Sequence, residues 1–244
     1  MPPGNLAFRC NPVKPTKEPC WERNCQMKDL PFKKFIDIAK SDPKDWFYFD
    51  YKYVHQWFKA DCEFSKQIKW DAFGFPEAGA PESTLWVGSR GAHTPCHQDT
   101  YGRNIVLQVY GRKRWLLFPP ECGGMKPSRV PYEESSIYSQ LNFHLPTDLT
   151  AFGGISGCRM VVLEPGDVLV VPNRWWHYVE HVSQIGITIN SWIPTENLDA
   201  ESRVGEAVTR LIIAQICKDL PEKCLPYILN PNEVLHSFII CLKY

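Results

Sequence analysis

Two motifs that lie far apart in the sequence constrain the fold of this chain most. The first is His97-Gln98-Asp99, and the second is the segment GDVLVVPNRWWH, which ends at His177. In a strand, residues i and i+2 point to the same face, so His97 and Asp99 converge while Gln98 turns away. The second motif predicts a turn, a buried strand, a corner at its proline and a histidine that opens the next strand. Two imidazoles and one carboxylate brought together in this way are the ligands of a facial-triad iron(II) site.

Other histidines compete with His177 for the third ligand position. The main rival is His181, which follows His177 by four residues and would share its face of the strand. His93 and His144 flank loops, where we expect them on the surface. His55 and His236 lie in helix-like or irregular surroundings. The ligand types leave Mn, Co, Ni or Zn open, but a structural zinc is disfavoured because three protein ligands leave a coordination position open.

The fold class follows from the run of short strands that begins near residue 83. Turn signals separate these runs, and this spacing predicts a sandwich or barrel. The predicted strands are 84–88, 95–99, 104–110, 114–118, 159–163, 168–171, 177–181 and 187–192. The motif that ends at His177 also resembles the second motif of cupin-type double-stranded β-helices, a fold that would bring the three ligands into the barrel mouth. We therefore expect a mainly β protein with a double-stranded β-helix (cupin, or jelly-roll) core at 83–194 and flanking N-terminal and C-terminal helices.

The segment 1–82 is predicted as a helical and irregular flank of this core. Within it, residues 6–10 are compatible with a short strand and residues 30–39 have helical spacing. The aromatic-dense segment 46–53 is either a strand or a part of the core.

Two further segments are expected to shape the molecule around the core. Residues 119–158 form a long insertion that bears proline and glycine, a type of segment that often serves as a binding element or lid. The region 195–244 is predicted to be helical, with apolar residues at three- and four-residue steps over 197–220. This helix either packs on the barrel or mediates a homodimer.

The amino-acid composition indicates which classes of binding partner and which cellular compartment to expect. Lysine and arginine balance aspartate and glutamate at 27 each, so bulk charge gives no support for nucleic-acid binding. The ten cysteines are scattered without any C-x-x-C pair, which predicts mostly buried free thiols in a reducing compartment. No signal peptide and no apolar run of about 20 residues are visible, so we expect no membrane segment and a cytoplasmic location, with the nucleus as an alternative.

Several motifs taken together resemble a JmjC domain. They are LWVGSRGAHTPCHQD from Leu85, QVYGRKRW from Gln108, PGDVL from Pro165, WWHY from Trp175 and ITINSW from Ile187. Within this family the chain is similar to the small hydroxylases, and most of all to the JmjC proteins associated with the 27 kDa small heat-shock protein. The resemblance covers roughly residues 46–215, and we expect the chain to lack the opening segment of such domains.

The resemblance implies Fe(II)- and 2-oxoglutarate-dependent oxygenation. Lys113 matches the family's lysine for the distal carboxylate of the cosubstrate, a pairing that is chemically sensible for a strand lysine inside a barrel. Without the motif, a solvated lysine in a short basic run would be the simpler interpretation. Thr94 matches a hydroxyl that binds the same carboxylate, Asn104 and Asn190 match amides of the cosubstrate pocket, and Tyr48 matches a phenol found in some relatives.

Three functions compete at this stage. The first is a hydroxylase of a protein side chain, and the second is a JmjC-fold interaction protein that binds a small heat-shock protein with little or no catalysis. The third, a hydroxylase of RNA bases or a histone demethylase, is disfavoured by the neutral charge and by the lack of histone-reader or zinc modules. Trp176 and Trp192 are expected to pack as hydrophobic walls or plain core. No residue pattern identifies the substrate.

Overall fold

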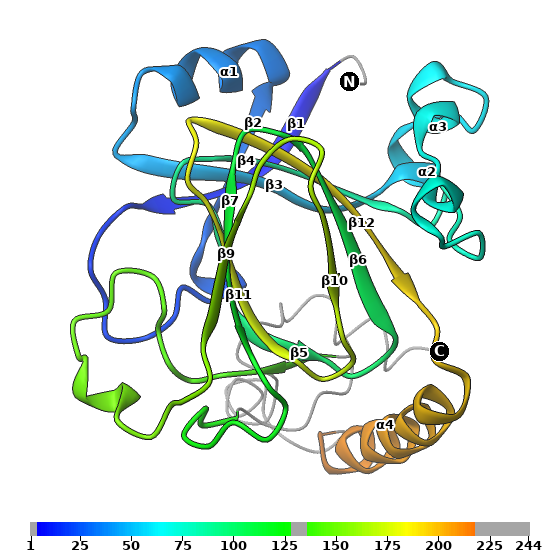
Figure 1. The fold of residues 1–244 in the computed structure, drawn as a ribbon. Coiled ribbons are helices and arrows are strands. Elements are labelled where there is room, and N and C mark those ends of the chain that lie inside the picture. The colour runs from blue at the N-terminus through cyan, green and yellow to red at the C-terminus, as the bar shows by residue number, and fades with distance from the viewer. Residues whose placement is uncertain (1–3, 128–135, 218–244) are drawn as a thin grey trace.

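The computed structural model describes residues 4–127 and 136–217 and places two antiparallel sheets face to face around a barrel-shaped interior (Figure 1). The larger sheet contains, in spatial order, β10 (Val168–Val171), β6 (Arg103–Tyr110), β12 (Ile185–Ile193), β4 (Thr84–Ser89), β3 (Asp45–Tyr53), β1 (Asn5–Pro12) and β2 (Gln26–Pro31). The smaller sheet contains, in spatial order, β8 (Ser136–Tyr138), β5 (His93–Asp99), β11 (Trp176–His181), β7 (Lys113–Phe118) and β9 (Arg159–Leu163).

The mainly β prediction is confirmed, and each of the eight predicted strands is present. Alternation explains why they form: along β7, the side chains of Lys113, Trp115 and Leu117 are buried, while Arg114 and Leu116 between them are partly exposed. The insertion at 119–158 adds the short strand β8 and a 3-10 helix, Thr150–Phe152, and its residues 128–135 lie outside the described part.

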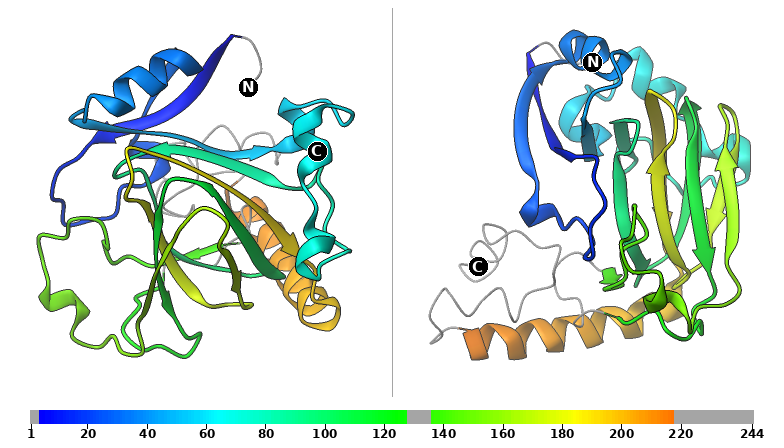
Figure 2. Two further views of the ribbon diagram at one scale, coloured as in Figure 1. Left: turned by 45° about the horizontal axis from the view of Figure 1, so that its top comes forward. Right: turned by 90° about the vertical axis from the view of Figure 1, so that its left-hand side faces the viewer.

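The N-terminal flank contains more strand than expected, because β1, β2 and β3 extend the larger sheet beyond β4 (Figure 2). The strand β2 was not predicted. It is an edge strand that pairs with β1 through its backbone, and none of its side chains, such as those of Gln26 and Lys28, is buried. The boundary of the core at residue 82 stays a prediction.

Several apolar cores hold the molecule together, and two of them pack against the larger sheet. One lies between the larger sheet and the helix α1 (Phe32–Lys40), where the rings of Phe8 and Phe35 stack at 4.5 Å and Phe49 packs against Phe8. The helix begins two residues later than predicted, because Leu30 and Pro31 still pair with β1. The second core fills the space between the two sheets and contains Val106, Trp115, Leu117, Leu163, Val171 and Val179.

Two short helices, α2 (Val54–Trp57) and α3 (Glu63–Gln67), follow β3, and a 3-10 helix, Trp70–Phe73, precedes β4. They lie together beside one end of the larger sheet (Figure 1). Within the described residues, none of the helices has the length and apolar character that a membrane crossing requires.

The C-terminal helix α4 (Glu196–Cys217) lies across one end of the barrel (Figure 2). The predicted helix 197–220 is thus found up to residue 217, and the rest of the predicted C-terminal region lies outside the described residues. Two of its carboxylates contact the barrel: Asp199 accepts from the backbone N–H of Gly102 at 2.8 Å, and Glu206 accepts from Thr100 Oγ1 at 2.8 Å. The described apolar side chains of the predicted series do not pack on the barrel; Val204, Val208, Leu211 and Ile212 are exposed.

The expectation that most cysteines are buried is wrong for the described part of the chain. Of the seven cysteines whose side chains are described, all free, Cys10 and Cys96 are buried, and Cys158 is exposed. The other four lie at partly exposed positions, Cys20 and Cys25 in the loop after β1, Cys62 just before α3 and Cys122 in the loop after β7.

The glycine at position 186 makes room for a buried histidine, and this gives a prediction of stability. A Cβ atom at Gly186 would lie 2.0 Å from Nδ1 of His181, whose side chain is fully buried. We expect Gly186→Ala to lower the free energy of unfolding by about 1–3 kcal/mol in urea denaturation, because the overpacked ring cannot move out of the core. Gly205→Ala is the control, since a Cβ there meets no atom within 4 Å; equal stability losses in both variants would contradict the prediction.

Candidate active site

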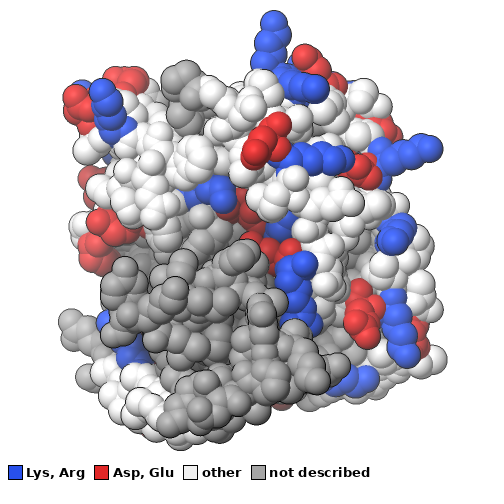
Figure 3. All heavy atoms as spheres, turned by 180° about the vertical axis from the view of Figure 1, so that it is seen from behind, with Lys and Arg blue, Asp and Glu red and all other residues white. Residues whose placement is uncertain are grey.

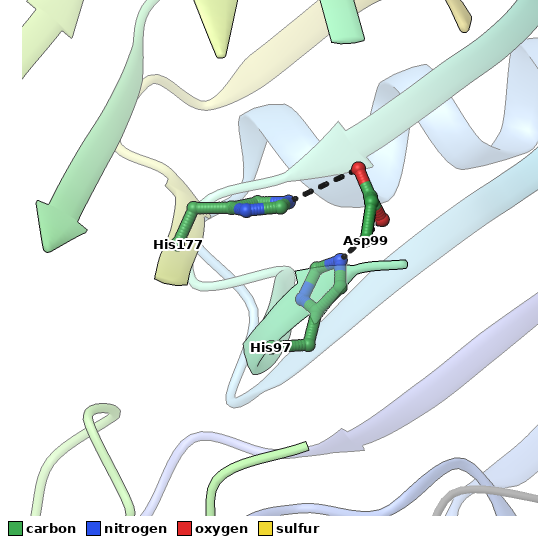
Figure 4. Close-up of side chains that lie close together, drawn as sticks. All are labelled: His97, Asp99 and His177. Carbon is green, nitrogen blue, oxygen red and sulfur yellow. Dashed lines mark ion pairs between the residues drawn. The ribbon is translucent and has the colours of Figure 1, made fainter. Parts of the chain in front are cut away.

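Three side chains that could hold a metal ion meet inside the barrel (Figure 4). His97 and Asp99 project from β5, and His177 projects from β11, where its Cα pairs directly with that of His97. Nε2 of His97 lies 3.6 Å from Oδ1 of Asp99, and Nε2 of His177 lies 3.8 Å from Oδ2 of Asp99. All three ligand atoms lie within 4.8 Å of one another, a spacing that fits a single shared cation.

Backbone carbonyls fix the orientation of both imidazoles. Nδ1 of His97 lies 2.9 Å from the carbonyl oxygen of Pro95, and Nδ1 of His177 lies 3.0 Å from that of Trp175. With Nδ1–H donating to these carbonyls, the lone pair of each Nε2 faces the centre, as a metal ligand requires. Burial, together with the nearby His177, lowers the pKa of His97 to about 4, so this imidazole is neutral at physiological pH.

A chain of hydrogen bonds holds the carboxylate of Asp99. Oδ2 accepts from Trp192 Nε1 at 3.0 Å and, at 3.5 Å, from Nδ2 of Asn104. The amide oxygen of Asn104 accepts from Asn190 at 2.8 Å, and the amide oxygen of Asn190 accepts from Trp86 Nε1 at 2.7 Å. The two predicted pocket amides therefore lie together and link the larger sheet to the ligand carboxylate.

Aromatic rings flank both histidines. Tyr138 stacks on His97 with ring centroids 5.3 Å apart, and Trp115 stacks on His177 at 5.8 Å. Sequence reasoning missed both rings, although the alternation along β7 places Trp115 on the same face as Lys113. It also treated Trp192 as a wall residue and missed its hydrogen bond to Asp99. Trp176 packs in the apolar cluster with Phe118, as expected.

Lys113 reaches into the interior from the smaller sheet and is 3% exposed. Its ammonium donates to the hydroxyl oxygen of Tyr48 at 3.1 Å and to Oγ1 of Thr188 at 3.2 Å, both on the larger sheet. The rings of Tyr48, Trp86 and Trp115 lie between 5.4 and 5.8 Å from Nζ. Sequence reasoning missed Thr188, because nothing along the chain indicates that β12 crosses the barrel opposite β7.

The surroundings of Lys113 fit an anionic ligand. Within the described residues, its ammonium forms no ion pair, although a buried cation normally has a carboxylate partner. Burial accordingly lowers the pKa of Lys113 to about 7, and Asp50 opposes part of this shift. Burial also raises the pKa of Tyr48, which keeps its phenol protonated and able to donate. A carboxylate brought in by a ligand would supply the missing negative charge.

The remaining described histidines lie away from the three ligands. The rival His181 has its Cα opposite that of Lys113, and neither of its ring nitrogens has a hydrogen-bond partner in the described structure. The expectation that His93 and His144 are surface residues is wrong. Their rings stack at 4.0 Å in the interior, because the insertion folds back over β5 and covers His93. His55 is exposed on α2, and His236 lies outside the described residues.

The ligands and the lysine line one cavity of about 480 Å³. Thr94, Asn104 and Asn190, predicted from the sequence, line it too. Tyr51 stands at its rim with φ of +55°, a left-handed conformation that is costly for a non-glycine residue and that occurs where β3 slips its register against β4. The cavity therefore has space for a small dicarboxylate and for an incoming side chain.

The hydrogen bond from Trp192 to Asp99 gives a testable prediction. We expect Trp192→Phe to weaken Mn(II) binding about 10- to 100-fold, because the ligand carboxylate loses the donor that orients it. Isothermal titration calorimetry measures this affinity. Trp176→Phe is the matched control, since Trp176 packs among apolar side chains on the other face; an unchanged affinity in Trp192→Phe would contradict the prediction.

Comparison with known proteins places the chain in a family. The cupin-like domain family matches residues 13–198, which is most of the chain, and the chain belongs to this family. Among named relatives, HSPB1-associated protein 1 from rat is 46% identical over 231 residues, covering 92% of this chain and 47% of that protein. The human protein of that name is 44% identical over 231 residues, covering 92% of this chain and 46% of that protein.

A more distant relative points to the chemistry of the family. The mouse 2-oxoglutarate and iron-dependent oxygenase JMJD4 is 29% identical over 127 residues, covering 47% of this chain and 27% of that protein. The resemblance to JmjC domains and the cupin fold predicted from the sequence are thus confirmed. This chain spans about half the length of the HSPB1-associated proteins that it matches.

Proposed function

We propose that this protein is an Fe(II)- and 2-oxoglutarate-dependent oxygenase that hydroxylates a protein side chain. The observation that carries the proposal is the presence, in one cavity, of His97, Asp99 and His177 together with a buried lysine that has no carboxylate partner among the described residues. A metal site alone would leave the buried cation unexplained. A dicarboxylate cosubstrate that reaches from the metal to Lys113 accounts for both features.

Each group of residues has a distinct task in this proposal. His97, Asp99 and His177 would hold Fe(II) from one side, and iron with 2-oxoglutarate supplies the oxidation of a substrate C–H bond when both are bound. Lys113 pairs with the distal carboxylate, and Tyr48 and Thr188 hold the ammonium in place. Asn104, Asn190 and Trp192 keep Asp99 in its orientation, and Thr94 lines the same pocket.

An anaerobic titration tests the proposal. When Fe(II) and then 2-oxoglutarate are added without oxygen, we expect a metal-to-ligand charge-transfer band in visible absorbance. The band should weaken strongly in Lys113→Ala, whose cavity lacks the cation for the distal carboxylate. Absence of the band in folded, iron-bound wild-type protein would overturn the proposed cosubstrate site.

A second candidate function is an interaction protein for a small heat-shock protein, with little or no catalysis. The observation that favours it is the name of the relatives, which describes association with HSPB1. Pull-down of a small heat-shock protein by wild type and by Asp99→Ala separates the candidates. Equal capture by both proteins favours a scaffold role, whereas an effect of the substitution on a cellular phenotype favours catalysis.

The partners and the location remain predictions that accompany these candidates. Positive and negative side chains alternate on the visible part of the face in Figure 3, so that part carries no basic patch for nucleic acid. We propose a cytoplasmic location, with the nucleus as an alternative. A homodimer through the exposed apolar residues of α4 is also a prediction, which light scattering after size-exclusion chromatography would check.

A further inference from the structure

Two cysteines lie close together in the loop between β1 and β2. The Sγ atoms of Cys20 and Cys25 are 3.6 Å apart, and both side chains are half-buried free thiols. The 3-10 helix Glu22–Asn24 lies between them, and the N–H of Cys25 donates to the carbonyl oxygen of Glu22. The loop thus already holds the two sulfur atoms near each other, and they need to approach only to about 2.05 Å to form a disulfide.

The two sulfur atoms have different surroundings. Cys20 Sγ accepts a hydrogen bond from Asn11 Nδ2 at 2.8 Å. The hydrogen bond from Cys25, the amide of Asn11 and the nearby Arg9 guanidinium lower the pKa of Cys20 to about 6. The pKa of Cys25 is raised by its hydrogen bond with Cys20 and by its partial burial. Both shifts favour Cys20 as the thiolate of the pair and Cys25 as the thiol.

A small oxidant has a route to Cys20. A second cavity, of about 310 Å³, is lined by Cys20 together with Asn11, Trp46 and His144. Cys25 does not line this cavity. A molecule that enters it would therefore meet the thiolate first.

The loop also forms part of the wall of the active site. Trp21, next to Cys20, is buried and makes an edge-to-face contact with Tyr138 at 6.0 Å, and Tyr138 stacks on His97. Glu22 lines the active-site cavity. A covalent bond between the cysteines would therefore constrain residues that border the candidate metal centre.

We propose that Cys20 and Cys25 form a thiol–disulfide couple that hydrogen peroxide oxidises. The Cys20 thiolate attacks one peroxide oxygen, the O–O bond breaks, and water leaves after protonation, which converts Cys20 to a sulfenic acid. The sulfur of Cys25 then attacks the sulfenic sulfur, the S–O bond breaks, and a second water leaves. Two thiols lose two electrons in total, and one peroxide molecule is reduced to two water molecules. The couple does not depend on metal binding or on the proposed oxygenase activity.

Peptide mapping tests the couple directly. Reduced protein is treated with hydrogen peroxide at pH 7, its remaining thiols are alkylated, and it is digested with trypsin, which cleaves after Lys17, Arg23 and Lys28. We expect peptides 18–23 and 24–28 joined through one disulfide and lighter than their sum by two hydrogen atoms. We also expect Cys20 to react at least roughly tenfold faster than the exposed Cys158.

Single variants separate the role of Cys20, which attacks the peroxide, from that of Cys25, which forms the disulfide. In Cys25→Ser, Cys20 should stop at the sulfenic acid and be labelled by dimedone, whereas in Cys20→Ser the Cys25 thiol should remain alkylatable. Cys158→Ser is the control and should form the disulfide at the wild-type rate. The proposal is overturned if Cys20 and Cys25 stay reduced at a peroxide dose that oxidises Cys158. It is equally overturned if Cys20 pairs with a different cysteine.

Discussion

Replacing Asp99 with alanine should weaken Mn(II) binding by at least about 100-fold. Loss of a residue that only orients a ligand already costs 10- to 100-fold in affinity, and Asp99 is the ligand itself in this proposal. It is also the only carboxylate among the three candidate ligands, the other two being imidazoles. Without the carboxylate, two imidazoles remain to bind a dication. Calorimetric titration with Mn(II) measures the loss, and succinate formation with Fe(II) and 2-oxoglutarate should fall to background.

The test needs a variant that keeps the shape of the site. Asp99→Ala leaves the buried N–H of Trp192 unpaired, which costs about 1–3 kcal/mol of stability by itself. Asp99→Asn retains an acceptor for Trp192 and removes only the charge, so it should lose metal binding and keep the fold. Asp37→Ala, at an exposed position on α1, is the matched control for loss of a carboxylate. Wild-type affinity in Asp99→Asn would exclude the proposed ligand set.

The metal ligands could be proposed from the sequence because local rules place them. The period of two along a strand puts His97 and Asp99 on one face, and the Pro-bearing corner puts His177 at the start of the next strand. Their meeting depends on one register, in which β5 and β11 pair His97 with His177. The barrel fold supplies that register, and the sequence motifs are specific for the fold.

The residues that surround Lys113 could not be predicted from the local sequence pattern. From the residues alone, a lysine between two arginines is most simply a solvated one. Only closure of the barrel brings Tyr48 and Thr188 from the opposite sheet to its ammonium, and neither lies near it in the sequence. Resemblance to a family identified the lysine, but it did not identify Thr188.

The C-terminal helix shows a different limit of prediction from the sequence. Its apolar spacing correctly predicted a helix, since periodicity reports the backbone conformation. The same spacing did not decide whether the apolar face packs on the barrel, and its residues Val204, Val208, Leu211 and Ile212 are exposed. Asp199 and Glu206 face the barrel because they satisfy donors in the segment that follows Asp99, including the N–H of Gly102. Such contacts between distant segments leave no periodic signal.

Lys113 should control the affinity for 2-oxoglutarate. We expect Lys113→Met to weaken binding of 2-oxoglutarate to the Mn(II)-loaded protein by about 2–5 kcal/mol, or roughly 30- to 5000-fold, because the cosubstrate carboxylate would be buried without a cation. Mn(II) binding in the absence of cosubstrate should not change, which separates this variant from Asp99→Ala. Arg112→Met, at the exposed position just before β7, is the matched control.

The same lysine should make cosubstrate binding depend on pH. The groups around its ammonium are Tyr48, Thr188, His181 and, farther away, Asp50, and the net effect of burial is a pKa of about 7 in the free protein. A carboxylate ligand binds the protonated form, so it raises this pKa and takes up a proton when bound above pH 7. The affinity should therefore be constant below pH 7 and fall by up to about tenfold per pH unit above it, until the pKa of the complex is reached.

Calorimetry in buffers of different ionisation enthalpy should detect the proton uptake in wild type and none in Lys113→Met. A wild-type dissociation constant that stays flat from pH 6 to 9 would place the binding charge on a group other than Lys113.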